Sequence, residues 1–321
     1  MNDGTDQSTR SFSTRGQRAK IIRRPPRFGS NMRYNGGRNS NAKMKTNERK
    51  EDKKNTFGSF PYGNYPAYYT QRRKQGNAVI DPRIDLVDAS VFKHKRILDI
   101  GCNSGNLTIA IAKMYDIISI HGVDIDEGLI SKANKNARVA YSLQNPHETN
   151  DINTTTMPFD LSLRFHYFPQ SMTNMFGMLP MTLPPNCPKP KGFPYNVTFE
   201  TMDWTTADVE KETYDTVLAL SITKWIHLHR GDEGLKAFFQ KIHDTLKPGG
   251  TLVLEPQEFE TYQKKAKLID PSTKVEDELH FRPEEYTDYL INTVGFREHH
   301  DLGVPQSESK GFSRPVILYI K

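Results

Sequence analysis

Cysteine and long apolar segments are scarce in this chain of 321 residues. The two cysteines, Cys102 and Cys187, have no partner at the spacing of a metal site, so neither a zinc site nor a disulfide framework is expected. No run of about 18 apolar residues occurs, and the polar amino terminus lacks an apolar segment of signal-peptide length. These absences predict a protein without a membrane span or a bound metal, located in a reducing compartment.

Excess positive charge is confined to the amino-terminal segment. Residues 1–56 carry 15 basic and 5 acidic side chains, a net charge of +10, whereas the other residues carry 29 basic and 33 acidic ones, a net charge of −4. Because this segment has few large aliphatic residues, it cannot bury enough apolar surface to fold alone. We predict a disordered basic arm that serves nucleic acid binding or nuclear import, or is a solubilising tail.

Residues 57–321 are predicted to form one α/β domain. Apolar runs predict strands near residues 96–100, 118–123, 197–202, 214–221, 251–255, 296–302 and 314–320. Helical spacing predicts helices near residues 105–114, 127–142, 232–247 and 283–293. This alternation predicts a mostly parallel sheet with helices on both faces. Residues 144–195, rich in proline and without periodicity, are expected to form a long insertion, either mobile or functional.

The stretch Ile97–Gly105, followed by Val123–Asp126, predicts a nucleotide-binding strand, turn, helix and second strand. Asn103 stands where a dinucleotide-binding turn usually has its middle glycine, and an aspartate precedes the turn. Such a turn suits a cofactor without phosphate groups, and S-adenosylmethionine is the common one. Asp124 is placed to accept hydrogen bonds from ribose hydroxyls, or else to cap the next helix, a role for which Asp126 is better placed.

The ends of the other strands bring polar and aromatic side chains to the same edge of the sheet. Asp203 and Trp204 are predicted to hold an adenine, although core packing suits Trp204 equally well. Lys224 either faces an anion or extends to solvent, and His227 either joins it or is structural. Either a basic, aromatic edge or an ordinary surface helix is expected after the fifth strand, from Tyr262, Lys264 and Lys265.

Several strings, taken together, resemble one family of enzymes. They are Tyr62–Tyr69, Asp99–Gly105, Val123–Asp126, Ser221–Leu235, Leu254–Gln257 and Lys310–Val316. In these strings, which run from about residue 60 to the end of the sequence, the chain resembles the bicoid-interacting-protein-type RNA methyltransferases. Within that family it looks most like the enzymes that form methylphosphate caps on small nuclear RNA. The resemblance implies a Rossmann-like, seven-stranded sheet of the S-adenosylmethionine-dependent methyltransferase type.

The resemblance also implies methyl transfer from S-adenosylmethionine to the 5′-terminal (γ) phosphate of a small non-coding RNA, in the nucleus. The implied cofactor contacts are Tyr68, Arg83, Gly101, Cys102, Asn103, Asp124, Ile125, Asp203, Trp204 and Leu220. The implied RNA-end or catalytic contacts are Tyr68, Tyr69, Arg72, Lys224 and His227. The pair Asp203–Trp204 departs from the Asn–aromatic pair expected in the family, whereas Lys224 favours triphosphate ends over the branch that methylates monophosphate ends.

This chemistry needs no general base, because a phosphate oxygen is already charged and nucleophilic at neutral pH. The protein must align two reactants and hold a polyanion, for which tyrosine hydroxyls, Arg72 and Lys224 are suitable. Two alternatives stay open. One is an RNA-binding, stabilising subunit of a ribonucleoprotein, with further RNA-binding proteins as partners, which the basic arm favours. The other is a methyltransferase for small molecules or proteins.

Overall fold

The computed structural model describes residues 60, 62–65, 68–69, 81–143, 170–183, 185, 188, 190–305 and 312–321. All of them belong to the second of two units of the chain, Met1–Phe57 and Gly58–Lys321. The predicted basic arm, Arg72, Cys187 and residues 144–169 of the predicted insertion lie outside the described residues. Within the described ranges, no helix is long and apolar enough to cross a membrane. The same ranges contain no group of three His, Cys, Asp or Glu residues that could hold a metal ion.

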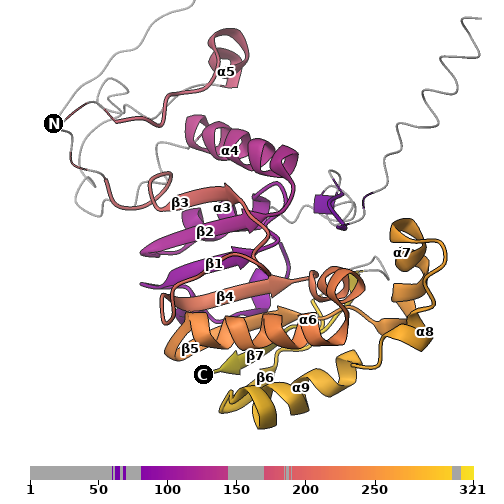
Figure 1. The fold of residues 1–321 in the computed structure, drawn as a ribbon. Helices are drawn as coiled ribbons and strands as arrows, with labels where there is room; N and C mark the ends of the chain where they lie inside the picture. Colours follow the sequence, from indigo (N-terminus) through magenta and orange to yellow (C-terminus); the bar gives the residue numbers. More distant parts are fainter. Residues whose placement is uncertain are drawn as a thin grey trace, which may run out of the picture. The chain divides into compact units, whose positions relative to one another are not determined.

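Seven strands form one sheet in the order β3-β2-β1-β4-β5-β7-β6 (Figure 1). They are β1 (Arg96–Ile100), β2 (Ser119–Asp124), β3 (Val197–Thr201), β4 (Tyr214–Leu220), β5 (Leu246–Glu255), β6 (Glu298–Asp301) and β7 (Ile317–Ile320). Strands β1 to β5 pair in parallel, and β7 runs antiparallel to both of its neighbours. The predicted mostly parallel sheet of seven strands is confirmed. The carboxyl ends of β1, β2, β4 and β5 therefore meet at one edge.

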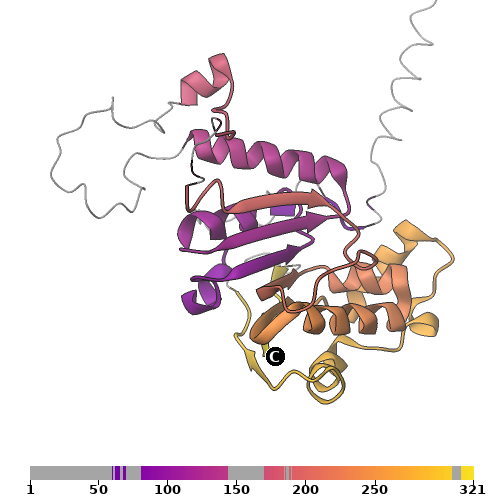
Figure 2. The ribbon, with the colours of Figure 1, turned by 60° about the vertical axis from the view of Figure 1, so that its left-hand side comes forward.

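Helices cover both faces of this sheet (Figure 2). One core includes residues of α3 (Asn106–Met114) and α4 (Glu127–Ser142), and the other includes residues of α6 (Thr223–Thr245) and of the helical run 283–294. Ile97 and Leu98, neighbours in β1, belong to different cores because successive side chains of a strand point to opposite faces. A strand buried on both sides is mostly apolar, which explains Ile97, Leu98 and Ile100 in β1. Asp99, also buried in β1, accepts a hydrogen bond from Thr108.

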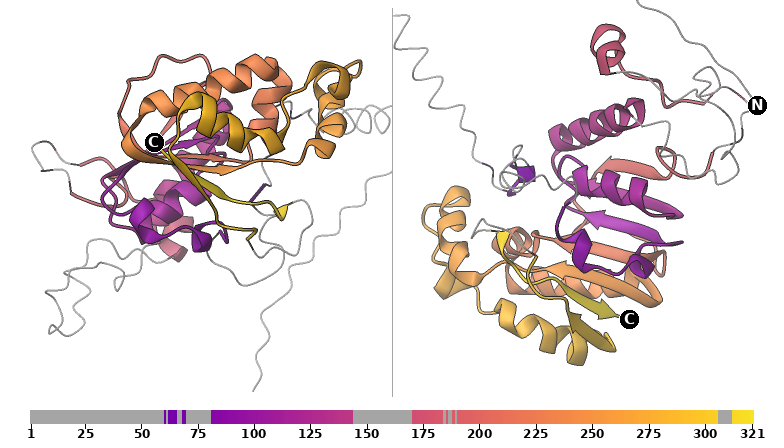
Figure 3. Two further views of the ribbon diagram at one scale, coloured as in Figure 1. Left: turned by 90° about the horizontal axis from the view of Figure 1, so that it is seen from below. Right: turned by 180° about the vertical axis from the view of Figure 1, so that it is seen from behind.

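Shorter helices connect these elements. They are η1 (Ile84–Leu86), η2 (Ala89–Val91), α5 (Gln170–Phe176), η4 (Phe259–Thr261), α7 (Tyr262–Ile269) and α8 (Val275–Glu278). The run 283–294 consists of η5 (Pro283–Glu285), α9 (Tyr286–Tyr289) and a π-helical turn, η6 (Leu290–Val294). Helices α7 and α8 stand beyond the carboxyl-end edge of the parallel strands and have a small core of their own (Figure 3).

The predicted helix at 232–247 corresponds to the second part of α6, which follows the non-helical residue Gly231 (φ 66°), whereas the first part, from Thr223, was not predicted. The first part has no clear apolar stripe, since Thr223, Lys224 and His227 are all buried although none is apolar. Helix α7 agrees with the surface helix that was one of two alternatives after the fifth strand: Lys264 is exposed on it, although Tyr262 is buried. Both elements matter to function, because each supplies residues to the pocket described next.

Candidate active site

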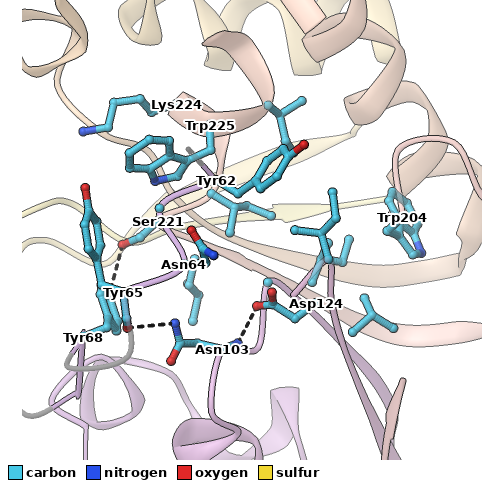
Figure 4. Close-up of a pocket in the computed structure, with 18 of the residues that line it drawn as sticks. Tyr62, Asn64, Tyr65, Tyr68, Asn103, Asp124, Trp204, Ser221, Lys224 and Trp225 are labelled. Carbon is cyan, nitrogen blue, oxygen red and sulfur yellow. Dashed lines mark hydrogen bonds between the residues drawn. The ribbon is translucent and has the colours of Figure 1, made fainter. Parts of the chain in front are cut away.

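A pocket of about 710 Å³ lies at the carboxyl ends of the parallel strands. Its wall is built from the ends of β1, β2 and β4, from α6 and α7, and from the segments around residues 62–69 and 312–314. Figure 4 shows Asp124 and Trp204 toward one end of the pocket and Lys224 and Tyr65 toward the other. The wall includes twelve of the predicted site residues: Tyr68, Tyr69, Arg83, Gly101, Asn103, Asp124, Ile125, Asp203, Trp204, Leu220, Lys224 and Lys265.

The turn after β1 is shaped by two residues with positive φ, Gly101 at 76° and Asn103 at 53°. A β-carbon on Gly101 would lie 2.4 Å from the Cγ2 atom of Ile222, so only glycine fits there. The amides of this turn are occupied inside the protein: those of Gly101 and Cys102 donate to the carbonyl of Val123. They are therefore not offered to a pyrophosphate, which agrees with the prediction of a cofactor without phosphate groups.

Asp124 holds this turn in place with both of its carboxylate oxygens. Its Oδ2 accepts a hydrogen bond from the Asn103 amide at 2.8 Å, and its Oδ1 accepts one from the Asp126 amide at 3.0 Å. A carboxylate oxygen can accept two hydrogen bonds, so each keeps capacity for a ribose hydroxyl. Burial raises the pKa of Asp124. Asp126 is the N-cap of α4, accepting from the Leu129 amide at 3.0 Å, which confirms the capping role expected for Asp126.

Asp203 and Trp204 border the same end of the pocket but have partners within the protein. Asp203 forms an ion pair of 2.7 Å with Arg230 and accepts from the Thr205 amide at 3.1 Å. Although burial raises the pKa of Asp203, hydrogen bonds from Thr205 and Arg230 outweigh it and lower the pKa overall. The indole of Trp204 is 3% exposed and packs edge-on against Phe238. Core packing therefore accounts for most of the Trp204 surface, and an adenine could touch only its pocket-facing edge.

An aromatic segment, residues 62–65 with 68–69, forms a wall of the pocket and packs on the domain. A β-carbon on Gly63 would lie 2.1 Å from the Trp225 indole, which shows how closely the two chains approach. Asn64 Nδ2 donates to Asp126 Oδ2 at 2.5 Å, and Tyr65 Oη accepts from Lys265 Nζ at 2.7 Å.

Lys224, Lys265 and Arg314 line the pocket together with two further cations, Arg83 and Arg230, which form ion pairs with Asp81 and Asp203. Lys224 is 4% exposed, and its Nζ donates to Thr261 Oγ1 at 3.0 Å. Burial, with the nearby charges of Arg314 and Lys265, lowers the pKa of Lys224 to about 7. Three cations gathered in a partly buried wall favour an anionic ligand, since binding one relieves their mutual repulsion.

Four predicted residues do not line the pocket. His227 is fully buried and pairs with Asp232 at 2.6 Å, and burial lowers its pKa, so we assign it to the core rather than to catalysis. Cys102 is 1% exposed beneath the turn, and Tyr262 is fully buried in the small core of α7 and α8. Lys264 is exposed on the surface of α7. Arg72 lies outside the described residues.

Arg314 and Tyr65 line the pocket although neither was singled out from the sequence. Both lie in strings that carried the family resemblance, Lys310–Val316 and Tyr62–Tyr69. The sequence around Arg314 indicates an anion-binding turn only when the position of this segment relative to β4 is known. That position depends on the pairing of β7 with β5.

Comparison with known proteins matches this chain to two families. The Bicoid-interacting protein 3 (Bin3) family matches residues 214–321, and a methyltransferase domain matches residues 97–180. The first range holds β4, α6 and Arg314, and the second holds the glycine turn and Asp124. Arg83 and residues 202–205, which also line the pocket, lie outside both matched ranges.

The chain is 35% identical over 274 residues to the 7SK snRNA methylphosphate capping enzyme of Mus musculus, covering 82% of this chain and 41% of that protein. It is 33% identical over 272 residues to the U6 snRNA methylphosphate capping enzyme Amus of Drosophila melanogaster, covering 82% and 75%. It is 22% identical over 240 residues to the Pre-miRNA 5'-monophosphate methyltransferase of Xenopus laevis, covering 66% and 72%.

This chain thus spans about two fifths of the length of the mouse relative and three quarters of the Drosophila one. With its glycine turn, its sheet order and this extent of identity, the chain belongs to the Bicoid-interacting protein 3 family and has the fold of S-adenosylmethionine-dependent methyltransferases.

Proposed function

We propose that this protein transfers a methyl group from S-adenosylmethionine to the 5′-terminal γ-phosphate of a small non-coding RNA and so forms a methylphosphate cap. The observation that carries the proposal is the pairing of two unlike regions in one pocket. The end with Asp124 offers acceptors for a ribose, and Lys224, Lys265 and Arg314 offer cations for a polyanion. The names of the relatives at 33% and 35% identity describe the same product.

The residues of the pocket account for the chemistry that this reaction needs. When bound, the cofactor supplies an electrophilic methyl group on a positively charged sulfur. Asp124 would hold the ribose hydroxyls, and the three cations would hold the terminal phosphates with their charges offset. A phosphate oxygen is nucleophilic without losing a further proton, so His227 is not needed as a base. Alignment of the two reactants can contribute roughly 7–11 kcal/mol to the rate.

Transfer of labelled methyl to one RNA, prepared with a 5′ triphosphate, monophosphate or hydroxyl end, tests this function. We expect the label on the triphosphate RNA, and we expect it to be lost when the γ-phosphate is removed. Label on the monophosphate RNA alone would assign this protein the activity named for the Xenopus relative. Salt-dependent RNA binding without transfer to any end would instead support a stabilising subunit of a ribonucleoprotein.

We further propose that the protein acts in the nucleus, with RNA-binding proteins of the same ribonucleoprotein as partners. The snRNA substrates in the names of the relatives support this location, and a polycation of 15 basic residues in residues 1–56 suits nuclear import as well as RNA. A tagged protein found only in the cytoplasm would contradict it.

The rate of methyl transfer is expected to depend on the protonation of Lys224. The ammonium of Lys224 has a pKa lowered to about 7 by burial and by Arg314 and Lys265, so in the free enzyme it loses its charge as the pH rises through that value. The specificity constant kcat/KM for RNA should therefore fall above about pH 7, because kcat/KM reports the ionisation of the free enzyme. Bound phosphate stabilises the ammonium, so kcat should fall only at higher pH.

The pH profiles can be measured from about pH 6 to about pH 9 at saturating cofactor. Lys224→Arg is the matched variant, because a guanidinium stays charged over this range. We expect the falling limb of kcat/KM to disappear in this variant. A limb at the same pH in both proteins would show that another group titrates.

Deletion of residues 1–56 is expected to weaken RNA binding and to flatten its dependence on salt, while the affinity for the cofactor stays unchanged. The segment carries a net charge of +10, against −4 for the rest of the chain. Each phosphate contact that is lost should reduce the slope of log K against log salt by about 0.7–0.9. Filter binding at several salt concentrations measures the slope. An unchanged slope would identify the segment as a solubility or localisation signal.

A further inference from the structure

Ser221, the residue that follows β4, has a backbone conformation that a serine rarely adopts. Its φ is 61°, in the region that favours glycine. Among the described residues, positive φ outside glycine occurs also at His94, Asn103 and Glu212. Asn103 uses this geometry to direct its amide to Asp124. The strained backbone at Ser221 raises the question of what its side chain does.

The hydroxyl of Ser221 makes three hydrogen bonds. Its Oγ donates to Glu255 Oε2 at 2.5 Å and accepts from Tyr68 Oη at 3.1 Å and from Arg314 Nη1 at 2.9 Å. A hydroxyl can donate one hydrogen bond and accept two. Because a carboxylate accepts and a guanidinium donates, the directions of the bonds to Glu255 and Arg314 are fixed. The hydroxyl proton of Ser221 therefore points to Glu255. The two acceptor sites of the Ser221 oxygen bind Tyr68 and Arg314, which belong to the pocket wall.

Glu255 holds the hydroxyl of Ser221 in one orientation. It is fully buried at the end of β5, and its Oε2 also accepts from Arg83 Nη1 at 2.8 Å. Arg83 in turn binds both oxygens of Asp81, through Nε at 2.9 Å and Nη2 at 2.8 Å. Because each of these buried groups is paired, the Glu255 carboxylate has little freedom to turn away from Ser221.

Tyr68 and Arg314 come from parts of the chain that are far apart in sequence, 153 and 93 positions from Ser221. Both line the pocket, and the Tyr68 ring packs edge-on against Phe312 at 5.5 Å. Figure 4 shows the bond from Tyr68 to Ser221 on the left, toward the end of the pocket with Tyr65 and Lys224. The hydroxyl of Ser221 thus joins β4 to the two segments that complete the wall.

We propose that Ser221 is a positioning residue: its hydroxyl, oriented by Glu255, sets Tyr68 and Arg314 for binding of the terminal phosphates and for methyl transfer. The transfer part rests on the proposed function, whereas the phosphate-binding part does not. Ser221 itself need not touch either reactant. Loss of its hydroxyl removes this shared contact from both side chains at once, so the effects of changes at Ser221 and Tyr68 should not be independent.

Ser221→Gly and Ser221→Ala test the proposal, since both remove the hydroxyl but only glycine relieves the backbone. We expect kcat with 5′-triphosphate RNA to fall by roughly a hundredfold in both, the size of effect that a misplaced reacting group causes. The affinity for inorganic tripolyphosphate, measured by calorimetry, should fall by about tenfold, in keeping with a loosened bond to a charged group. The cofactor affinity should change by less than about twofold.

Glu212→Gly is the matched control, because Glu212 has a φ of 49° and is exposed in the loop before β4. It gains the same backbone relief and should leave both readouts unchanged. The double variant Tyr68→Phe with Ser221→Gly should lose no more activity than the more severe single variant, since both changes break one contact.

Additive losses in the double variant, or an unchanged kcat and unchanged tripolyphosphate affinity in Ser221→Gly, would overturn the proposal. If the wild-type protein binds tripolyphosphate but transfers no methyl group, the proposed function fails, and the calorimetric comparison still decides whether Ser221 organises the phosphate site.

Discussion

Replacement of Lys224 by methionine is expected to reduce methyl transfer to 5′-triphosphate RNA by roughly a thousandfold, the upper range for loss of one preorganised charge-stabilising group. Lys224 lies in the first turn of α6 and faces the pocket beside Lys265 and Arg314. Methionine keeps the length of the side chain and removes only the ammonium, so the loss of packing should be small. The repulsion among the terminal phosphates would then be offset by two cations instead of three.

Single-turnover transfer at saturating cofactor measures this effect, and calorimetry with S-adenosylmethionine should show no change. Lys211→Met is the matched control, because Lys211 is an exposed lysine, 78% exposed, before β4 at the opposite edge of the sheet. A Lys224→Met rate within about threefold of wild type, under about 1 kcal/mol of transition-state energy, would refute the role assigned to Lys224.

Replacement of Asp124 by alanine is expected to weaken the binding of S-adenosylmethionine by a hundredfold or more. Hydrogen bonds to a charged group contribute about 1.5–3 kcal/mol each, and about 1.4 kcal/mol corresponds to a tenfold change in Kd. Alanine removes the acceptors for the ribose and also leaves the amides of Asn103 and Asp126 without their partner. The affinity should therefore fall through loss of contact and through loosening of the turn.

Asp124→Asn separates these two causes, since an amide oxygen can still accept one of the backbone hydrogen bonds and preserve part of the turn. Asp126→Asn is the control: asparagine is also a good N-cap for α4, and Asp126 does not line the pocket. Calorimetry on the three variants, each checked for a cooperative thermal transition, decides the matter. An unchanged Kd in a folded Asp124→Ala protein would remove the cofactor site from this end of the pocket.

The sheet and the turn after β1 were predictable from the sequence because their signals are local. A strand buried on both faces is mostly apolar, as at Ile97, Leu98 and Ile100 of β1, and a turn with positive φ favours the glycine found at Gly101. Asp124 could be placed for the same reason, since the end of a parallel strand lies at a known edge of the sheet. These features depend on residues within a few positions of each other.

The first part of α6, residues 223–230, was not predicted because its residues are buried by contacts at the pocket rather than along a single apolar face. Lys224 and Thr223 are buried in the first turn of α6 because Gln257, from the segment after β5, accepts hydrogen bonds from both. No local periodicity records such a partner. His227 illustrates the reverse: its spacing from Lys224 suggested a shared site, but its pairing with Asp232 keeps it in the core.

The sequence by itself determined the fold class, a turn that suits a cofactor without phosphate groups, and the position of Asp124 at the end of β2. Each of these depends on residues that are neighbours in the sequence. Only the tertiary structure decided which side chains share the anion-binding wall. Lys265 reaches Tyr65 across 200 positions of the chain, and Arg314 reaches Ser221 across 93. Such contacts form because strand order and helix packing bring distant segments together. The residues next to Lys265 and Arg314 in the sequence do not indicate which partner each will contact.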